Sequence, residues 1–164
     1  MKRSLQDWAN LAEIIGGVAI ILSLLFVGLQ LSENSRQVRS ETAHSVTAGL
    51  QSWYNGLGVS AQASANFRKG MSAPETLSPD ESVQFLMAVH SVMLIYQTMY
   101  YLGVEGTLDD EMNSAMSSAL RAAVPTSGFA WYWDQRSGYF TKEFQAFIAQ
   151  LRADEPDGGA KIYR

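Results

Sequence analysis

The sequence contains no cysteine and only two histidines, His44 and His90. Without thiols, the chain forms no disulfide, thiolate nucleophile, iron–sulfur cluster or cysteine-based zinc site. Two histidines are too few for a multi-histidine metal site within one chain. The lack of cysteine fits a cytoplasmic protein, although small periplasmic domains can lack it too.

The chain also lacks a basic block. Its 12 basic and 16 acidic residues give a formal net charge of −4, and the basic residues are dispersed among the acidic ones. Nucleic-acid binding needs a concentrated cationic face that neutralises phosphates. We therefore expect no nucleic-acid partner.

Charge is absent from residues 14–31, which are mostly Ile, Leu, Val and Phe. As a helix this run would extend about 27 Å, close to the hydrocarbon thickness of a bilayer. The alternative is a cleaved signal peptide, but Asp7 and Glu13 precede the run, the run is long, and no A-x-A-like site follows it. We predict an N-terminal flank at residues 1–12 and a transmembrane helix at residues 13–31, with membrane lipids as its surroundings.

The basic residues around this span bear on its orientation. Lys2 and Arg3 precede it, and Arg36 and Arg39 follow it, so the two sides carry equal numbers. The second pair lies closer to the membrane edge. We therefore expect the following domain on the cytoplasmic side of the membrane.

Small residues recur along one face of the predicted span at i, i+4, i+7 and i+11, and polar residues extend the same face beyond it. Small side chains let two transmembrane helices approach closely, so such a face favours association. Gly and Ala are also common in any transmembrane helix, which is the alternative explanation. The predicted association face consists of Ala12, Gly16, Ala19, Ser23, Gln30, Asn34, Gln37 and Glu41.

The remaining sequence predicts an all-α fold in which the transmembrane helix continues into a small helical bundle at residues 32–152. The first helix could run to Ala65, with Gly56 and Gly58 as weak points. Gly70 and Pro74 belong to a predicted connector. Ser78-Pro79-Asp80-Glu81 is a capping box that starts an uncharged helix over residues 82–104. This helix is either the centre of the bundle or a second membrane span, and its polar interruptions favour the bundle.

Three shorter helices are predicted after it. The first runs from the Thr107-Leu108-Asp109-Asp110 cap to about Ala123, before Pro125. An aromatic helix over residues 128–136 and a helix over residues 144–151, capped by Thr141, complete the bundle. No strand pattern occurs, and we expect a loose tail at residues 153–164.

The histidines and the acidic cluster can be explained without a catalytic or metal-binding role. His90 lies among apolar residues and is expected to be a core histidine, while His44 pairs with Glu41 on the helix that follows the span. Asp109, Asp110 and Glu111 occupy a helix first turn, where the helix dipole favours acids without a metal. The sequence has no nucleophile elbow or phosphate loop. We therefore expect no enzyme activity, no metal and no cofactor.

Aromatic residues cluster near the C-terminus. Adjacent aromatics cannot all face one core, so we expect part of the cluster to meet a partner or lipid headgroups. Core packing still explains at least one of the two tryptophans. The candidate interface aromatics are Trp131, Tyr132, Trp133 and Tyr139.

The order of these segments resembles a group of uncharacterised bacterial proteins. Residues 13–16, EIIG, and 23–30, SLLFVGLQ, followed by Asn34-Ser35 and Val38-Arg39, resemble that group's "EIIGAxAVxxSLxYVGLQ" span and "RxNTxxVR" sequel. Its closing "G…WW…R…F…F" segment resembles residues 128–147. The resemblance implies a single-pass inner-membrane protein with a small helical domain and no assigned activity. One departure is that relatives often carry an acid in the middle of the second helix, where this chain has Ile95, Tyr96 and Gln97.

The expected function is association, either as a homo-oligomer or as an accessory or scaffold subunit of another membrane protein. The alternative is a bundle that binds a lipid or an apolar small molecule at the membrane surface. Its pocket would be lined by the Met- and Tyr-rich second helix, with Met87, Met93, Tyr96, Met99, Tyr100 and Tyr101.

Overall fold

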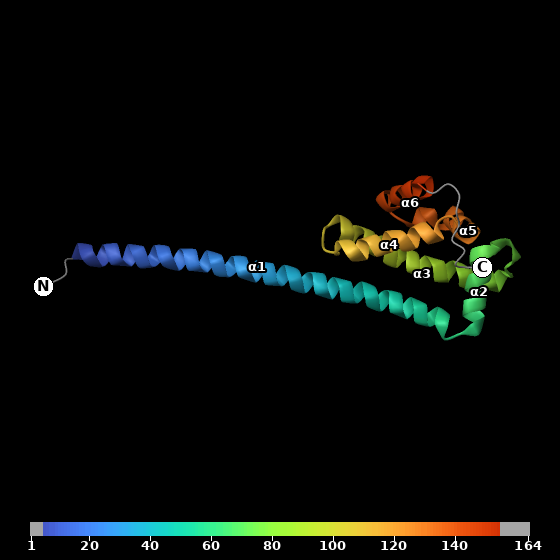
Figure 1. Ribbon diagram of the computed structural model, residues 1–164, viewed down its shortest axis with the longest axis horizontal. Helices are drawn as coiled ribbons and strands as arrows, with labels where there is room; N and C mark the ends of the chain where they lie inside the picture. The colour runs from blue at the N-terminus through green and yellow to red at the C-terminus, as the bar shows by residue number, and fades with distance from the viewer. Residues whose placement is uncertain (1–4, 155–164) are drawn as a thin grey trace. The chain divides into compact units, whose positions relative to one another are not determined.

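The computed structural model describes residues 5–154, which form six α-helices and two short 3-10 helices without a β-strand (Figure 1). The all-α prediction is therefore confirmed, and the chain has a long apolar N-terminal helix. The predicted tail, residues 153–164, falls outside the described part except for Ala153 and Asp154, which end the last helix. Contacts divide the chain into two compact units, Met1–Glu41 and Thr42–Arg164.

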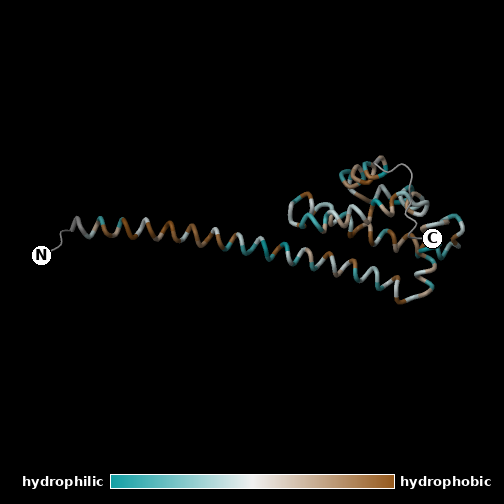
Figure 2. The backbone as a smooth tube through the Cα atoms, viewed as in Figure 1, coloured by the Kyte–Doolittle hydropathy of each residue, from teal (hydrophilic) through white to brown (hydrophobic). Residues whose placement is uncertain are grey.

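The first helix, α1, spans Leu5–Gly58, so the first unit consists of its N-terminal portion. Figure 2 shows a hydrophobic run early in α1 and a more hydrophilic stretch after it. Continuation of the helix to Ala65 is a wrong prediction, because α1 ends at Gly58. Ser60 adopts an extended backbone, and its hydroxyl oxygen accepts a hydrogen bond from the Ala63 amide at 3.2 Å. This N-cap starts a new helix, which is why the break falls at the predicted weak point.

The second helix, α2 (Ala61–Ser72), contains Gly70, so the predicted connector begins later than expected. A 3-10 helix, η1 (Pro74–Thr76), leads to α3 (Pro79–Val104). The predicted capping box of α3 is confirmed: Ser78 and Glu81 each accept a hydrogen bond from the other's backbone amide. The side chain of Lys69 also binds Glu81 at 2.8 Å, and this contact, with the Ser78 amide, lowers the pKa of the Glu81 carboxyl.

Three further helices complete the second unit: α4 (Asp110–Ala123), α5 (Ser127–Arg136) and α6 (Lys142–Asp154), with η2 (Ser137–Tyr139) between the last two. Asp109 is the N-cap of α4, and Thr126 caps α5. Their boundaries agree with the predicted ones to within a few residues.

The core of the second unit surrounds α3, which packs against α2, α4 and α5, while α4 also packs against α6. Phe85, Val89 and Met93 project from α3 into this core. Met116 and Leu120 of α4 and Phe144 and Ile148 of α6 are buried in the same core. The core therefore forms from one apolar stripe of each helix around an apolar central helix.

Two glycines allow α2 to approach its neighbours closely. A side-chain carbon at Gly70 would overlap the ring of Phe85, and one at Gly128 would overlap the backbone of Gly70 and Met71. The hydroxyl of Ser127 donates to the Ser72 carbonyl oxygen at 3.0 Å beside this crossing. The α2–α5 contact therefore requires glycine at position 128, whereas Gly70 leaves room for the Phe85 ring of α3.

Candidate functional site

The apolar segment of the first unit exposes its side chains along its whole length. Leu24 and Leu29 are 67% and 71% exposed, and each described side chain from Trp8 to Glu41 is exposed. A contiguous apolar surface of this extent is covered by lipid or by another protein in a stable assembly. By length and composition, α1 can cross a membrane.

The central helix α3 passes the same test of length and composition, but its environment differs. One third of its most apolar stretch is buried inside the second unit, whereas none of the corresponding stretch of α1 is buried. Phe85 and Met93 are at most 2% exposed. These contacts favour α3 as a core helix over a second span.

The predicted association face lies wholly within the first unit. At about 100° per residue, its eight positions fall within a sector of about 60° around the helix axis. All eight are exposed. The amide nitrogen of Gln37 donates to a carboxylate oxygen of Glu41 at 3.0 Å, so these two polar side chains act together on the surface.

The candidate interface aromatics do not share one environment, and this corrects the prediction for two of them. Tyr132 is 0% exposed and Trp133 is 7% exposed, because both turn inward from α5 into the core. Trp133 stacks between Phe129 and Phe140. Trp131 is half-buried against Phe85.

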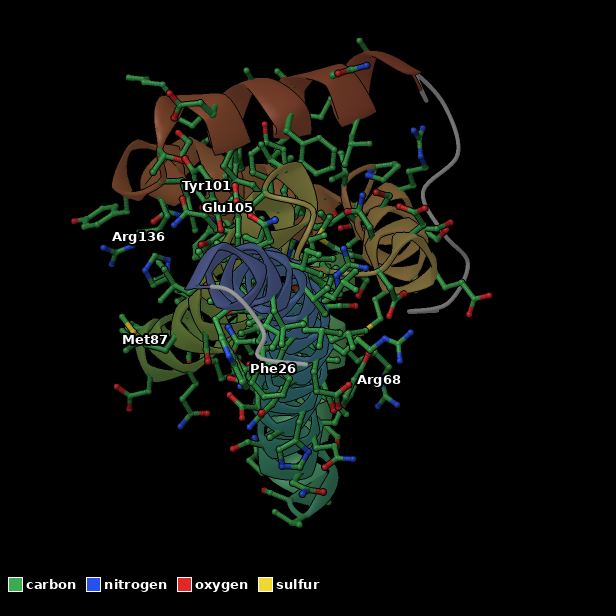
Figure 3. All side chains as sticks on the ribbon, turned by 90° about the vertical axis from the view of Figure 1, so that its left-hand side faces the viewer. Phe26, Arg68, Met87, Tyr101, Glu105 and Arg136 are labelled. Carbon is green, nitrogen blue, oxygen red and sulfur yellow. The ribbon has the colours of Figure 1, made fainter. Side chains whose placement is uncertain are left out.

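Only Tyr139, in η2, remains as a strongly exposed member of the predicted set, with 66% of its surface open. The guanidinium carbon of Arg136 lies 5.0 Å from the centre of its ring. Figure 3 shows Arg136 at the surface of the second unit. This cation–π pair is the part of the aromatic cluster that is available to solvent or to a partner.

The His90 imidazole packs among aromatic rings, which fits the predicted core histidine. Its Nδ1 lies 2.8 Å from the hydroxyl of Tyr132, and the ring also contacts Tyr139 and Phe140. Burial and the nearby Arg136 charge lower the pKa of His90, while burial raises the pKa of Tyr132. At neutral pH the tyrosine hydroxyl therefore keeps its proton and the imidazole is uncharged, and the histidine tautomer determines which of the two donates the hydrogen bond.

Comparison with protein-family models, curated proteins and solved structures found no match. The case for a function consequently comes from the geometry of the chain itself. Within residues 5–154, no three His, Asp or Glu side chains lie close enough together to hold a metal ion. Asp109 is engaged in capping α4, where it accepts a hydrogen bond from the Met112 amide at 2.8 Å.

The Met and Tyr residues predicted to line one pocket are separated in the structure. Met87 lies at the surface of α3 beside one cavity (Figure 3), whereas Met93 and Tyr96 line a second, smaller cavity. The ring of Tyr100 packs against Phe147. These residues point in different directions around α3, so a single pocket formed by them is a wrong prediction.

Sequence analysis did not single out Asn66. This residue of α2 is only 3% exposed, and its amide nitrogen donates to the Glu81 carbonyl oxygen at 3.0 Å. A lone Asn within the apolar side of a short helix was the available signal. The residues that surround it come from later helices, however, and only the tertiary structure reveals them.

Proposed function

We propose that this protein is a single-pass protein of a bacterial inner membrane that acts by association and not by catalysis. In this proposal α1 crosses the bilayer near its N-terminus, and the helical second unit lies in the cytoplasm. The apolar exposed surface of α1 supports the anchor, and the sequence resemblance supports the choice of membrane.

The observation that carries the proposal is the composition of one face of α1. Where the helix is apolar, this face presents Gly16, Ala19 and Ser23; where the helix becomes polar, the same face presents Gln30 and Asn34. In lipid, helices associate through close packing of small residues and through hydrogen bonds of polar side chains. This face carries small residues within the predicted span and polar residues beyond it. It therefore fits a single helix–helix contact that continues from the bilayer into water.

Association has two forms in this proposal. The partner is a second copy of the chain, which gives a homo-oligomer, or a different membrane protein, which makes this chain an accessory or scaffold subunit. A side-chain carbon added at Gly16 would meet no other atom of this chain within 4 Å. The space beside this face is therefore free for a neighbouring helix.

Cysteine cross-linking tests the face directly because the natural chain has no cysteine. Ser23→Cys places a nearly isosteric thiol on the face, and Leu25→Cys places one at a similar depth about 200° around the helix. Membranes that contain each variant are treated with copper phenanthroline, which oxidises two neighbouring thiols to a disulfide. We expect a dimer band for Ser23→Cys and little or none for Leu25→Cys.

The pattern of bands separates the alternatives. A Ser23→Cys product at twice the chain mass identifies self-association through the predicted face. Equal cross-linking of both variants would contradict the face, because a random encounter in the bilayer has no preferred side. Without a dimer, retention of another membrane protein by wild type but not by Gly16→Leu would identify an accessory subunit.

A further inference from the structure

An open cavity of about 800 Å³ lies in the second unit, between the C-terminal part of α1, α2 and α3. This volume is typical of pockets that hold small molecules. None of the described residues that line it carries a charge. A ligand of this cavity would therefore be uncharged, because an ion would lose its hydration without gaining a counter-charge.

The apolar walls of the cavity are aromatic and fixed in place. Trp53 of α1 donates its indole N–H to the Ala88 carbonyl oxygen of α3 at 2.7 Å. Its ring meets Phe67 edge-on at 5.5 Å, and Phe67 in turn packs against Phe85. Because the Trp53 N–H is already bonded, these walls offer ring faces and edges to a ligand and no hydrogen-bond donor.

Asn66 is the buried member of the polar part of the wall, which also includes Ser52, Ser60, Gln62, Gln84 and Ser91. Its amide nitrogen donates both to the Glu81 carbonyl oxygen and to the side-chain oxygen of Gln84, at 3.0 and 3.2 Å. These two acceptors fix the orientation of the amide, since a flipped Asn66 would place oxygen against oxygen. Its Oδ1 is buried and has no hydrogen-bond partner among the described residues.

A buried acceptor without a donor is costly, so a ligand that supplies the donor gains affinity. The neighbouring Gln84 side chain is exposed and is held at Asn66 by the 3.2 Å hydrogen bond. Because Asn66 Oδ1 is buried, a ligand donor reaches it only when a neighbouring side chain moves, and the exposed Gln84 can turn towards solvent while the Glu81 contact still holds the amide. The site thus combines an aromatic cradle with one oriented acceptor.

We propose that this cavity binds a small, uncharged, mainly apolar molecule that carries one O–H or N–H donor, which it gives to Asn66 Oδ1. A phenol or an indole has this chemistry. The proposal is independent of association through α1, because all residues of the cavity belong to the second unit.

Fluorine NMR of 4-fluorophenol with the full chain in lipid nanodiscs tests the proposal, and empty nanodiscs correct for partition into lipid. The matched probe is 4-fluoroanisole, which has the same ring but a methyl group in place of the donor proton. We expect saturable binding of the phenol and about tenfold weaker binding of the anisole, the ratio that corresponds to one hydrogen bond.

Substitutions of lining residues test whether the phenol binds in this cavity. Gly56 lines the cavity, and a side chain there would meet no atom within 4 Å, so Gly56→Leu should fill the space without a clash and abolish binding. Gly58→Leu is the control, because Gly58 also has free space around it but is not among the lining residues. Asn66→Leu should remove the preference for the phenol over the anisole.

Several results would overturn the proposal. These are no binding above that of empty nanodiscs, equal affinity of the two probes, or unchanged binding to Gly56→Leu. In the first case, water satisfies Asn66 and the cavity has no ligand of this class. If Asn66→Leu fails to fold, the two glycine variants and the two probes still decide the outcome.

Discussion

The hydrogen bond between His90 and Tyr132 ties α3 to α5 inside the second unit. Burial is the main cause that lowers the pKa of the imidazole below its usual value of 6.5, and the Arg136 charge acts in the same direction. The unfolded chain therefore binds a proton at His90 more readily than the folded chain does. The contribution of neutral His90 to the free energy of unfolding is fully present above about pH 6.5. It is lost as the pH falls through and below that value.

We predict that the urea midpoint of the second unit falls between pH 7.5 and pH 5.5, measured by tryptophan fluorescence of the full chain in detergent. The His90→Gln variant keeps a polar partner for Tyr132 but does not titrate, so its midpoint should change less over this range. Glu81 does not interfere, because its lowered pKa places its titration below the range. An equally steep pH dependence in wild type and variant would contradict the assignment to His90.

At the scale of elements, the close crossing of α2 and α5 depends on Gly128. A methyl group there would overlap backbone atoms of Gly70 and Met71, which cannot move aside as a side chain can. We predict that Gly128→Ala lowers the free energy of unfolding by about 1–3 kcal/mol, the usual cost of overpacking. Gly138→Ala, where the added methyl group meets no atom within 4 Å, is the control. Equal urea midpoints for the two variants would contradict this prediction, because they would mean that α2 and α5 move apart without loss of stability.

The element boundaries that sequence analysis predicted best are those that depend on local chemistry. The Ser78–Glu81 capping box and the helix end before Pro125 depend on residues within one turn of each other. The Ser60 cap is equally local, but sequence analysis predicted one helix to Ala65 and gave only Gly56 and Gly58 as weak points within it. Helical periodicity therefore predicted the presence of the helices correctly, but it did not predict the end of α1.

The candidate site residues were harder to predict because their partners are distant in the chain. His90 and Tyr132 are 42 residues apart, and Asn66 meets Gln84 across 18 residues. Helical phase gave the predicted faces, but it could not show that α5 turns Tyr132 and Trp133 into the core. The small-residue face of α1 was predictable because it depends on phase alone.

At the scale of the whole molecule, membrane anchoring requires that α1 remains part of the mature protein. We predict that the membrane fraction retains the chain after an alkaline carbonate wash and that residues 14–31 are still part of the retained chain, as detected by mass spectrometry. A transmembrane helix is held by its buried apolar surface, which carbonate does not disturb. A soluble product that lacks the first 30 or so residues would instead identify residues 14–31 as a cleaved signal sequence.

The most direct test of association is the native mass of the protein after gentle extraction into lipid nanodiscs. We expect a complex, either an integer multiple of the 18.1 kDa of this chain or a larger assembly that includes another chain. Gly16→Leu should shift this mass towards one copy, whereas Gly17→Leu, the same substitution about 100° away, should not. A wild-type protein that is monomeric and alone in the nanodisc would contradict association through α1.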